Sequence, residues 1–141
     1  MKKTKFFNKV ESKWILIDAK DKVLGRLAAQ VARILQGKTK ATYSPNFLCG
    51  DHVVIINASL IRCTGNKREQ KLYDRYSGYP GGIRAISLKN LQEKNPSRVI
   101  YCAIRGMLPK TMLAKRMIRR LKIYPGDKHE QEAQQPVLLE V

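Results

Sequence analysis

The sequence has few of the residues that support disulfide bonds, metal sites or membrane insertion. Its three cysteines, Cys49, Cys63 and Cys102, are widely spaced and form no Cys-x-x-Cys pair, so neither a disulfide framework nor a zinc ribbon is indicated. We expect three reduced, packed thiols in a cytoplasmic protein. No stretch approaches the roughly 18 consecutive apolar residues that a membrane span needs. The basic start of the chain leads into no long apolar run, so we expect no secretory signal and no membrane partner.

Histidine is also scarce, and His52 and His129 are the only two. His129 begins the stretch HEQEA, which lacks the second histidine of a zinc-protease motif. Asp51 and His52 are adjacent at the start of a predicted strand, where neighbouring side chains point to opposite faces. No Gly-x-Ser-x-Gly motif is present. With so few candidate bases, we predict that the protein is not an enzyme and has no catalytic residue, cofactor or metal ion.

Nucleotide-binding loops are missing as well. The stretch GMLPKT, residues 106–111, ends like a phosphate-binding loop, but Pro109 precedes Lys110 and has no N–H to offer a phosphate. The turn before the first predicted helix contains the single Gly25, so the Gly-x-Gly-x-x-Gly fingerprint is absent too. The sequence therefore predicts no nucleotide pocket and no small-molecule substrate.

Acidic residues are few, and the resulting positive charge is unevenly distributed. The chain has 28 lysines and arginines against 11 aspartates and glutamates, which gives a formal net charge of +17. Residues 62–124 carry 16 basic and 3 acidic side chains, whereas residues 125–141 carry 1 basic and 4 acidic ones. Because so many like charges repel one another in a compact domain, this composition predicts a polyanionic partner, a nucleic acid.

The first half of the chain predicts a strand, a helix and a second strand. Residues 14–19 form an apolar run that is too short for a helix. Residues 22–36 repeat apolar residues at spacings of three and four, with Asp21 as the expected cap and Gly37 as the expected stop. Four β-branched residues at 53–56 indicate a central strand that is covered on both faces. Such a βαβ unit requires parallel pairing through a right-handed crossover.

The predicted fold class is α/β, a small, mainly parallel sheet with helices packed on it in three α/β/α layers, plus an extended basic loop and a C-terminal tail. The expected later elements are a strand at 71–76, a helix LKNLQEK capped by Ser87, a helix at 96–107 opened by Asn95 and Pro96, and a last helix at 110–121. We assign residues 1–141 to a single domain, with a basic N-terminal extension at 1–13 and an extended tail at 125–141, where Pro136 argues against a helix.

The last predicted helix has an apolar stripe and a basic remainder. Leu113, Met117 and Leu121 lie on the stripe together with Ala114 and Ile118, and the other positions hold cations without an acid among them. We interpret these cations as a phosphate-binding face, since arginine forks onto phosphate oxygens. We expect the methionines at 107, 112 and 117 to fill the core.

The stretch RYSGYPGGIR, residues 75–84, joins glycines and tyrosines to arginines without an acid. Its GYPG matches the Gly-x-x-Gly loop of KH domains, but the surrounding residues do not predict the two helices that such a loop joins. We predict a hairpin or turn at Pro80-Gly81 that contacts polymer phosphate. The sequence allows two alternatives for each of the tyrosines at 73, 76 and 79. The ring is either half-buried in the protein, or exposed and stacked on an RNA base. The complete predicted RNA-binding set is Lys67, Arg68, Lys71, Arg75, Tyr76, Tyr79, Gly81, Gly82, Arg84, Arg105, Lys110, Lys115, Arg116, Arg119, Arg120 and Lys122.

Four stretches resemble the bacterial form of the large-subunit ribosomal protein thirteen family: WILIDAKDKVLGRLAAQVARILQGK, GDHVVIINA, TGNKREQKLYDRYSGYPGGIR and AIRGMLPKTMLAKRMIRRLKIYPGDKHEQEAQQP. The resemblance extends from Trp14 to Pro136. It implies an α/β protein in the large ribosomal subunit of the cytoplasm, which binds ribosomal RNA, supports early assembly, contacts neighbouring ribosomal proteins and catalyses nothing. The alternative is an RNA-binding regulator or RNA-modifying enzyme that acts off the ribosome.

The family's motifs fall on particular residues of this chain. Its tyrosine-glycine-proline loop falls on residues 79–82, and its basic segment falls on Lys110, Lys115, Arg116, Arg119, Arg120 and Lys122. Two departures stand out. Ala114 replaces a glycine that many relatives have, which indicates a helix that continues there. Residues 130–132 replace a region where relatives often have a second histidine, which weakens any role for His129.

Overall fold

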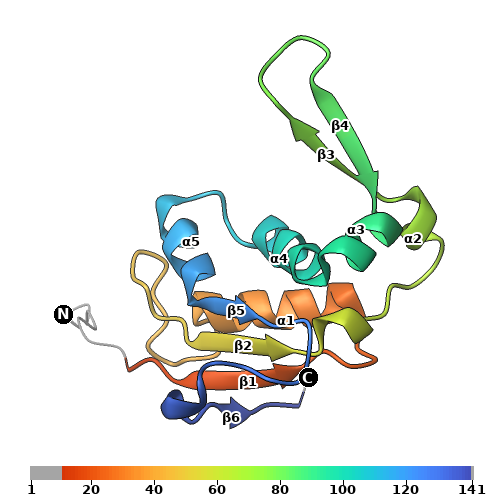
Figure 1. Ribbon diagram of the computed structural model, residues 1–141. Coiled ribbons are helices and arrows are strands. Elements are labelled where there is room, and N and C mark those ends of the chain that lie inside the picture. Colours follow the sequence, from red (N-terminus) through yellow and green to blue (C-terminus); the bar gives the residue numbers. More distant parts are fainter. Residues whose placement is uncertain (1–10, 141) are drawn as a thin grey trace.

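A four-stranded sheet runs through the centre of the protein in the computed structural model, which describes residues 11–140 (Figure 1). Most of the basic extension expected at 1–13 lies outside the described residues. The elements in chain order are β1 (Trp14–Asp18), α1 (Leu24–Gln36), β2 (His52–Ile56), the 3-10 turn η1 (Ala58–Leu60), α2 (Lys67–Gln70), β3 (Leu72–Tyr76), β4 (Ile83–Ser87), α3 (Leu88–Lys94), α4 (Pro96–Met107), α5 (Met112–Met117), the 3-10 turn η2 (Ile118–Arg120), β5 (Leu121–Ile123), the 3-10 turn η3 (Glu132–Gln134) and β6 (Val137–Leu138).

The sheet confirms the predicted βαβ unit and the predicted parallel pairing. Its strand order is β5-β2-β1-β6, and each neighbouring pair of strands is parallel. β1 and β2 are in register from the pair Trp14 and His52 to the pair Asp18 and Ile56. β2 is the central strand that its β-branched residues predicted, because Val53, Val54 and Ile55 are all fully buried.

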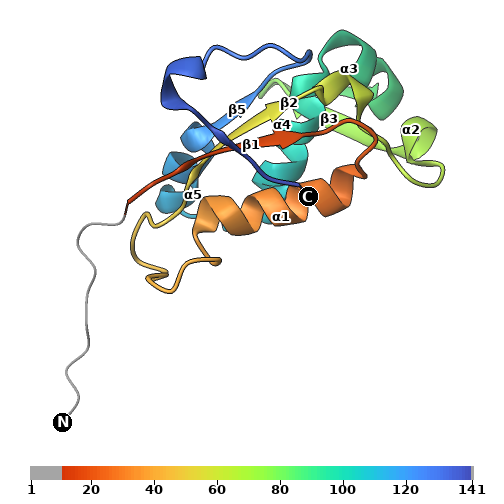
Figure 2. The same ribbon diagram turned by 90° about the horizontal axis from the view of Figure 1, so that it is seen from below.

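One face of the sheet and the main helices share a single apolar core. The sheet contributes Ile17 and Ile55 to this core, and α1 contributes Leu27, with α3, α4 and α5 adding further buried side chains. The amphipathic helix predicted from the apolar spacing is therefore confirmed, since the buried residues of α1 all face the same side. Figure 2 shows α1 running alongside β1 and β2. This confirms the α/β class.

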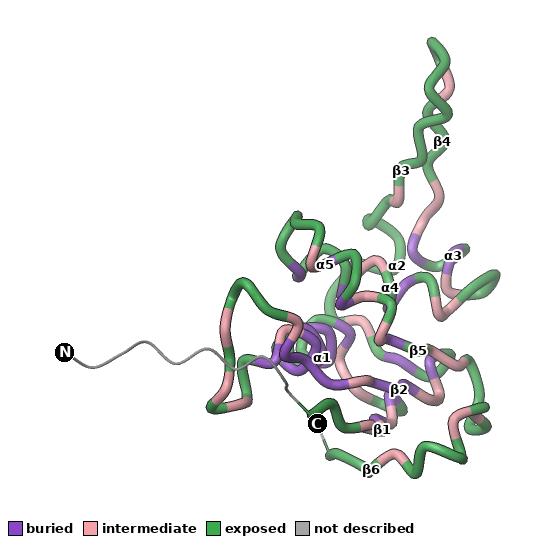
Figure 3. The backbone as a smooth tube through the Cα atoms, turned by 90° about the vertical axis from the view of Figure 1, so that its left-hand side faces the viewer, coloured by how far each residue is buried: buried purple, intermediate pink, exposed green. Residues whose placement is uncertain are grey.

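The opposite face of the sheet is covered by the C-terminal segment, which makes the third layer with a single 3-10 turn in place of a helix. Figure 3 shows α1 on one side of the sheet and the chain between β5 and β6 on the other. This segment is attached by backbone hydrogen bonds from Asn57 N to Gly126 O (2.7 Å), from Ala58 N to Tyr124 O (3.1 Å) and from Leu139 N to Leu16 O (2.8 Å). The tail is therefore extended over much of its length, as predicted, but it also carries η3 and the unpredicted strand β6.

The first helix begins later than predicted. Asp21 does not cap it, because α1 starts at Leu24 with Val23 in the cap position and no capping side chain. Asp21 has a φ of +57° and lies in a turn that is bonded to the end of η1, with its N–H donating to Leu60 O. Gly37 ends the helix as predicted, in the left-handed conformation at φ +78°.

The caps of the later helices follow the prediction, but the last helix is shorter than expected. The side chain of Ser87 accepts a hydrogen bond from Asn90 N, and the side chain of Asn95 accepts one from Arg98 N. α5 ends at Met117, because the chain tightens into η2 and Leu121 then joins the sheet as the first residue of β5. The expectation of a helix to residue 121 is thus wrong for its last turn.

The packing of the sulfur-containing side chains differs in part from the prediction. Met117 is buried, but Met107 and Met112 are 43% and 71% exposed, so these two are not core residues. All three cysteines are free, with Cys49 buried and the other two partly buried. Between residues 11 and 140, no helix is both long enough and apolar enough to span a membrane.

Candidate nucleic-acid interface

The structure leaves nearly all of the predicted RNA-binding residues accessible to a partner. The exposed members are Lys67, Arg68, Lys71, Arg75, Tyr76, Tyr79, Gly81, Arg84, Arg105, Lys110, Lys115, Arg116, Arg119 and Lys122. Gly82 and Arg120 are partly buried, and both have contacts within the protein. These residues fall on α2, the β3–β4 hairpin, α4, α5 with η2, and β5, except that Lys71 lies between α2 and β3 and Lys110 lies in the turn before α5.

The β3–β4 hairpin projects from the body of the protein as an arm (Figure 1). It is an antiparallel pair that is separate from the central sheet, with Leu72 opposite Ser87 at its base and Tyr76 opposite Ile83 near its tip. Strand β3 was predicted, whereas β4 was not, since its residues 83–87 carry no clear period-two pattern. The base is joined to the body by the bond from Leu88 N to Lys71 O (2.9 Å) and by the contact of β4 with α2.

The tip of the hairpin is a tight turn at Pro80-Gly81, as predicted. The N–H of Gly82 donates to Tyr79 O at 2.9 Å, and Gly81 has a φ of +73°, a conformation that favours glycine. Gly82 is required for a different reason, because a Cβ there would lie 1.9 Å from the Ser77 hydroxyl and 2.9 Å from Tyr79 O. Both glycines therefore shape the turn itself.

The three tyrosines of this segment divide into two kinds. Tyr76 and Tyr79 are 63% and 76% exposed and present their rings to solvent. Tyr73 packs against the core, with its hydroxyl buried without a hydrogen-bond partner and Lys71 Nζ 5.2 Å from its ring centroid. Burial raises the pKa of Tyr73. Only Tyr76 and Tyr79 are thus placed to stack on a base.

Helix α5 presents its cations outward because its apolar residues face the core. Thr111 caps it by accepting a hydrogen bond from Ala114 N at 3.3 Å, and Ala114 and Met117 are buried. The predicted apolar stripe is confirmed, since Leu113 and Ile118 also pack on the core. The side chains left exposed on this helix and the following turn include Lys115, Arg116 and Arg119.

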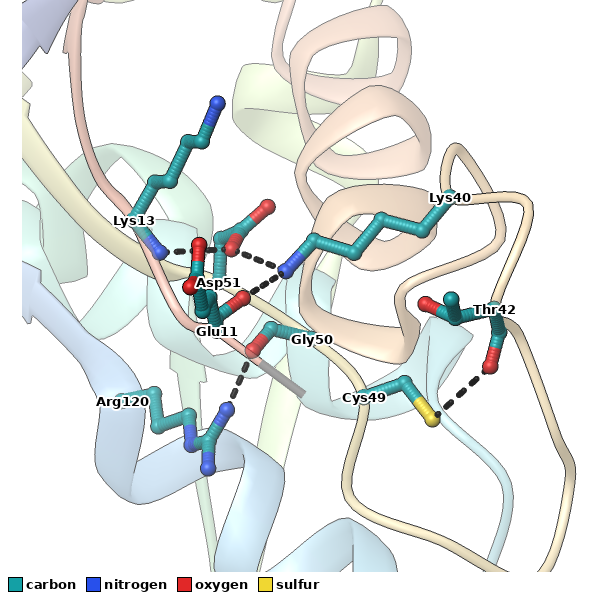
Figure 4. Close-up of polar contacts among 8 residues, drawn as sticks. All are labelled: Glu11, Lys13, Lys40, Thr42, Cys49, Gly50, Asp51 and Arg120. Atoms are coloured by element: carbon teal, nitrogen blue, oxygen red, sulfur yellow. Dashed lines mark hydrogen bonds and ion pairs between the residues drawn. The ribbon is translucent and has the colours of Figure 1, made fainter. Parts of the chain in front are cut away.

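Arg120 points into the protein. Its guanidinium donates a hydrogen bond to the carbonyl oxygen of Gly50, 70 positions earlier in the chain (Figure 4). The next residue along, Asp51, is buried and accepts hydrogen bonds from Lys13 N at 2.8 Å and from Lys40 Nζ at 2.5 Å. These contacts join the start of β1, the loop before β2 and the turn η2, so Arg120 is part of the scaffold beneath the exposed cations.

Both histidines are occupied by contacts within the protein. The ring of His52 stacks on Trp14 with their centroids 4.3 Å apart, and Nδ1 of His129 accepts a hydrogen bond from Gln131 N at 3.2 Å. Burial lowers the pKa of His52, and the nearby Arg120 lowers it further. His52 is therefore held in its neutral form more strongly than a free histidine.

The exposed cations of the predicted RNA-binding set form no ion pair with an acid between residues 11 and 140. Within residues 11–140, the only ion pair joins Lys40 to Asp51. Figures 1 and 3 place the hairpin, α4 and α5 together beyond the β5 edge of the sheet. These neighbouring elements carry exposed cations that form no ion pair within residues 11–140.

Helix α4 adds candidate residues that the sequence prediction did not include. Arg98, Tyr101 and Arg105 lie at helical spacing on one exposed face of α4. They line a groove of about 460 Å³ against β5, together with Leu121 and Ile123. Only Arg105 was predicted, although the spacing of three and four residues was visible in the sequence. Lys67 and Lys71 line a second cavity, of about 530 Å³, at the base of the hairpin.

Comparisons with known proteins assign the chain to a family. A family model described as ribosomal protein L13 matches residues 12–130. Similar proteins named large ribosomal subunit protein uL13 include that of Petrotoga mobilis, 52% identical over 90% of this chain and 84% of the relative, and that of Thermus thermophilus, 50% identical over 99% of both. The protein of the same name from Legionella pneumophila is 46% identical over 95% of this chain and 93% of the relative. The chain therefore belongs to the ribosomal protein L13 family and is a structural constituent of the large ribosomal subunit, not an enzyme.

Proposed function

We propose that the chain binds large-subunit ribosomal RNA through the exposed cations of the hairpin, α2, α4 and α5, and that it supports early assembly of the subunit in the cytoplasm. The observation that carries this proposal is the set of exposed cations on these elements, which form no ion pair within residues 11–140. Because the chain belongs to a family of large-subunit proteins, the expected polyanionic partner is ribosomal RNA. Neighbouring ribosomal proteins are the other expected partners.

The exposed arginines and tyrosines suit an irregular RNA surface. Each guanidinium offers a planar fork of N–H donors to phosphate oxygens and loses little hydration in doing so. The exposed rings of Tyr76 and Tyr79 can stack on unpaired bases, which favours single-stranded or looped RNA over regular duplex. The hairpin extends this set of contacts away from the body, so one small domain reaches RNA segments that are far apart.

Not every predicted residue has the same part in this proposal. Lys115, Arg116, Arg119 and Lys122 contact phosphates directly, as do the cations of α2 and the hairpin. Gly81 and Gly82 act by shaping the hairpin tip. Arg120 acts indirectly, because its bond to Gly50 O holds η2 and the exposed residues next to it in place.

The salt dependence of binding tests the proposal. The purified protein is titrated onto a large-subunit ribosomal RNA fragment at increasing salt, and the logarithm of affinity is plotted against the logarithm of salt concentration. Neutralising five or more phosphates predicts a slope on the order of −4. A slope near −1 would show that most of the exposed cations do not meet RNA.

Co-sedimentation separates the ribosomal role from the alternative of a regulator that acts elsewhere. The native protein is expected to stay with large subunits at moderate salt in a one-to-one ratio. A substoichiometric protein that is lost from subunits in the same wash would support the regulator and contradict the proposal.

A further inference from the structure

Two arginines face each other across the hairpin. Arg75 on β3 is directly opposite Arg84 on β4, and in an antiparallel pair such residues project from the same face with Cβ atoms about 5 Å apart. Like charges in this position destabilise a hairpin. This pair of cations therefore lowers the stability of the hairpin in the free protein.

Nothing in the described part of the protein compensates these two charges. Both side chains are exposed, and neither has a hydrogen bond or ion pair with another residue between 11 and 140. Asp74 is next to Arg75 in the chain, but it is opposite Ala85, and this alternate pair projects from the other face of the hairpin. Figure 3 shows the arm projecting from the body of the protein.

We propose that Arg75 and Arg84 close on one phosphate group of the RNA backbone as a two-arginine clamp. The inference rests on the proposed function and names the ligand of the hairpin. The cross-strand spacing allows both guanidinium groups to reach oxygens of the same phosphodiester, each through its fork of N–H donors. A single negative charge between them replaces the repulsion of the free protein with two attractions.

The hairpin holds the pair in position before RNA arrives. Toward the tip, Ser77 N donates to Gly82 O at 3.2 Å and the turn at Pro80-Gly81 closes the loop. Toward the base, Tyr73 is opposite Ile86 on the same face as the arginines, and both pack on the core. The register of the clamp is therefore set at both ends, which reduces the ordering cost of binding.

A double-mutant cycle with salt titration tests the clamp. Arg75→Gln, Arg84→Gln and the double variant are compared with wild type for binding to a large-subunit ribosomal RNA fragment. Because the two arginines share one anion, we expect each single substitution to weaken binding about tenfold and the double variant to lose less than the product of the two. For the double variant, the slope of log affinity against log salt concentration should become shallower by about 0.7 to 0.9, the value for one phosphate. The clamp would be overturned if the slope became shallower by twice that amount and the loss of affinity in the double variant equalled the product of the two single losses. Each arginine would then contact a separate phosphate.

Two further arms complete the experiment. The variant R75K/R84K keeps both charges but not the forks, so we expect weaker binding with an unchanged slope, and wild-type affinity would show that charge alone suffices. The α5 variant K115Q/R116Q/R119Q separates the clamp from the proposed function. If that variant loses affinity while R75Q/R84Q binds like wild type, the clamp is wrong, but the proposed binding of ribosomal RNA through the other cations is supported. If wild type itself does not bind the ribosomal RNA, both are overturned.

Discussion

Removing the cations of α5 and η2 should change RNA binding without changing folding. The variant K115Q/R116Q/R119Q takes three exposed charges from a surface on which no ion pair holds them. Glutamine has nearly the same helix propensity and length, and the repulsion between cations at helical spacing is relieved. We therefore expect the free energy of unfolding to stay within about 0.5 kcal/mol of the wild-type value, with any change toward greater stability.

The same variant should bind ribosomal RNA at least about tenfold more weakly at physiological salt. If each of the three side chains neutralises one phosphate, the slope of log affinity against log salt becomes shallower by about 2 to 3. Urea unfolding followed by fluorescence measures the stability, and a filter-binding titration at several salt concentrations measures the slope. Arg120 is left unchanged in this variant, because its bond to Gly50 O belongs to the scaffold.

Met117→Ala is the matched control on the buried side of the same helix. Met117 is 5% exposed and belongs to the core, so its truncation should lower the free energy of unfolding by about 2 to 5 kcal/mol. The salt slope of the folded fraction should not change. RNA affinity equal to wild type in the glutamine variant would refute the assignment of this helix to the interface and leave the hairpin and α4 as the contact surface.

Three other changes give distinct results. Arg120→Gln should lower the free energy of unfolding by about 1.5 to 3 kcal/mol in urea, because it removes a charged hydrogen bond to Gly50 O and leaves that carbonyl without this donor; unchanged stability would contradict the scaffold role. Gly81→Val should accelerate hydrogen exchange in the hairpin and reduce incorporation into subunits while the global unfolding midpoint stays the same, since valine resists the φ of +73°; equal losses of stability and incorporation would contradict this. Because burial lowers the pKa of His52 below its usual 6.5, the unfolded chain binds more protons, so stability should fall as the pH drops below about 6.5, and His52→Phe should flatten this dependence in urea titrations between pH 5 and 7.

Elements that depend on neighbouring residues could be predicted from the sequence. Ser87 and Asn95 cap helices because their side chains reach backbone N–H groups three residues later. Gly37 ends α1 because glycine tolerates a positive φ. Asp21 has the right chemistry for a cap, but its turn is bonded to residues 60 and 62, and those distant contacts moved the start of the helix.

Elements that depend on distant residues could not be predicted. β5 and β6 are three and two residues long and exist because β2 and β1 offer them hydrogen-bonding edges. β4 has no alternation of its own and takes its register from β3. The prediction of Met112 as a core residue is wrong for a related reason. Which face of α5 packs on the core depends on distant elements, and the Met112 side chain is 71% exposed.

The excess of positive charge and the βαβ unit follow from the sequence alone, because they depend on composition and on periodicity within a few residues. The nucleic-acid partner that this charge predicts stays a prediction. The position and contacts of each cation, in contrast, depend on the tertiary fold. It turned Arg120 toward the carbonyl of Gly50, and it set Arg75 opposite Arg84 across an arm that projects from the body. The physical reason is that both arrangements arise from pairings between residues far apart along the chain, where a side chain's role depends on what the fold brings beside it.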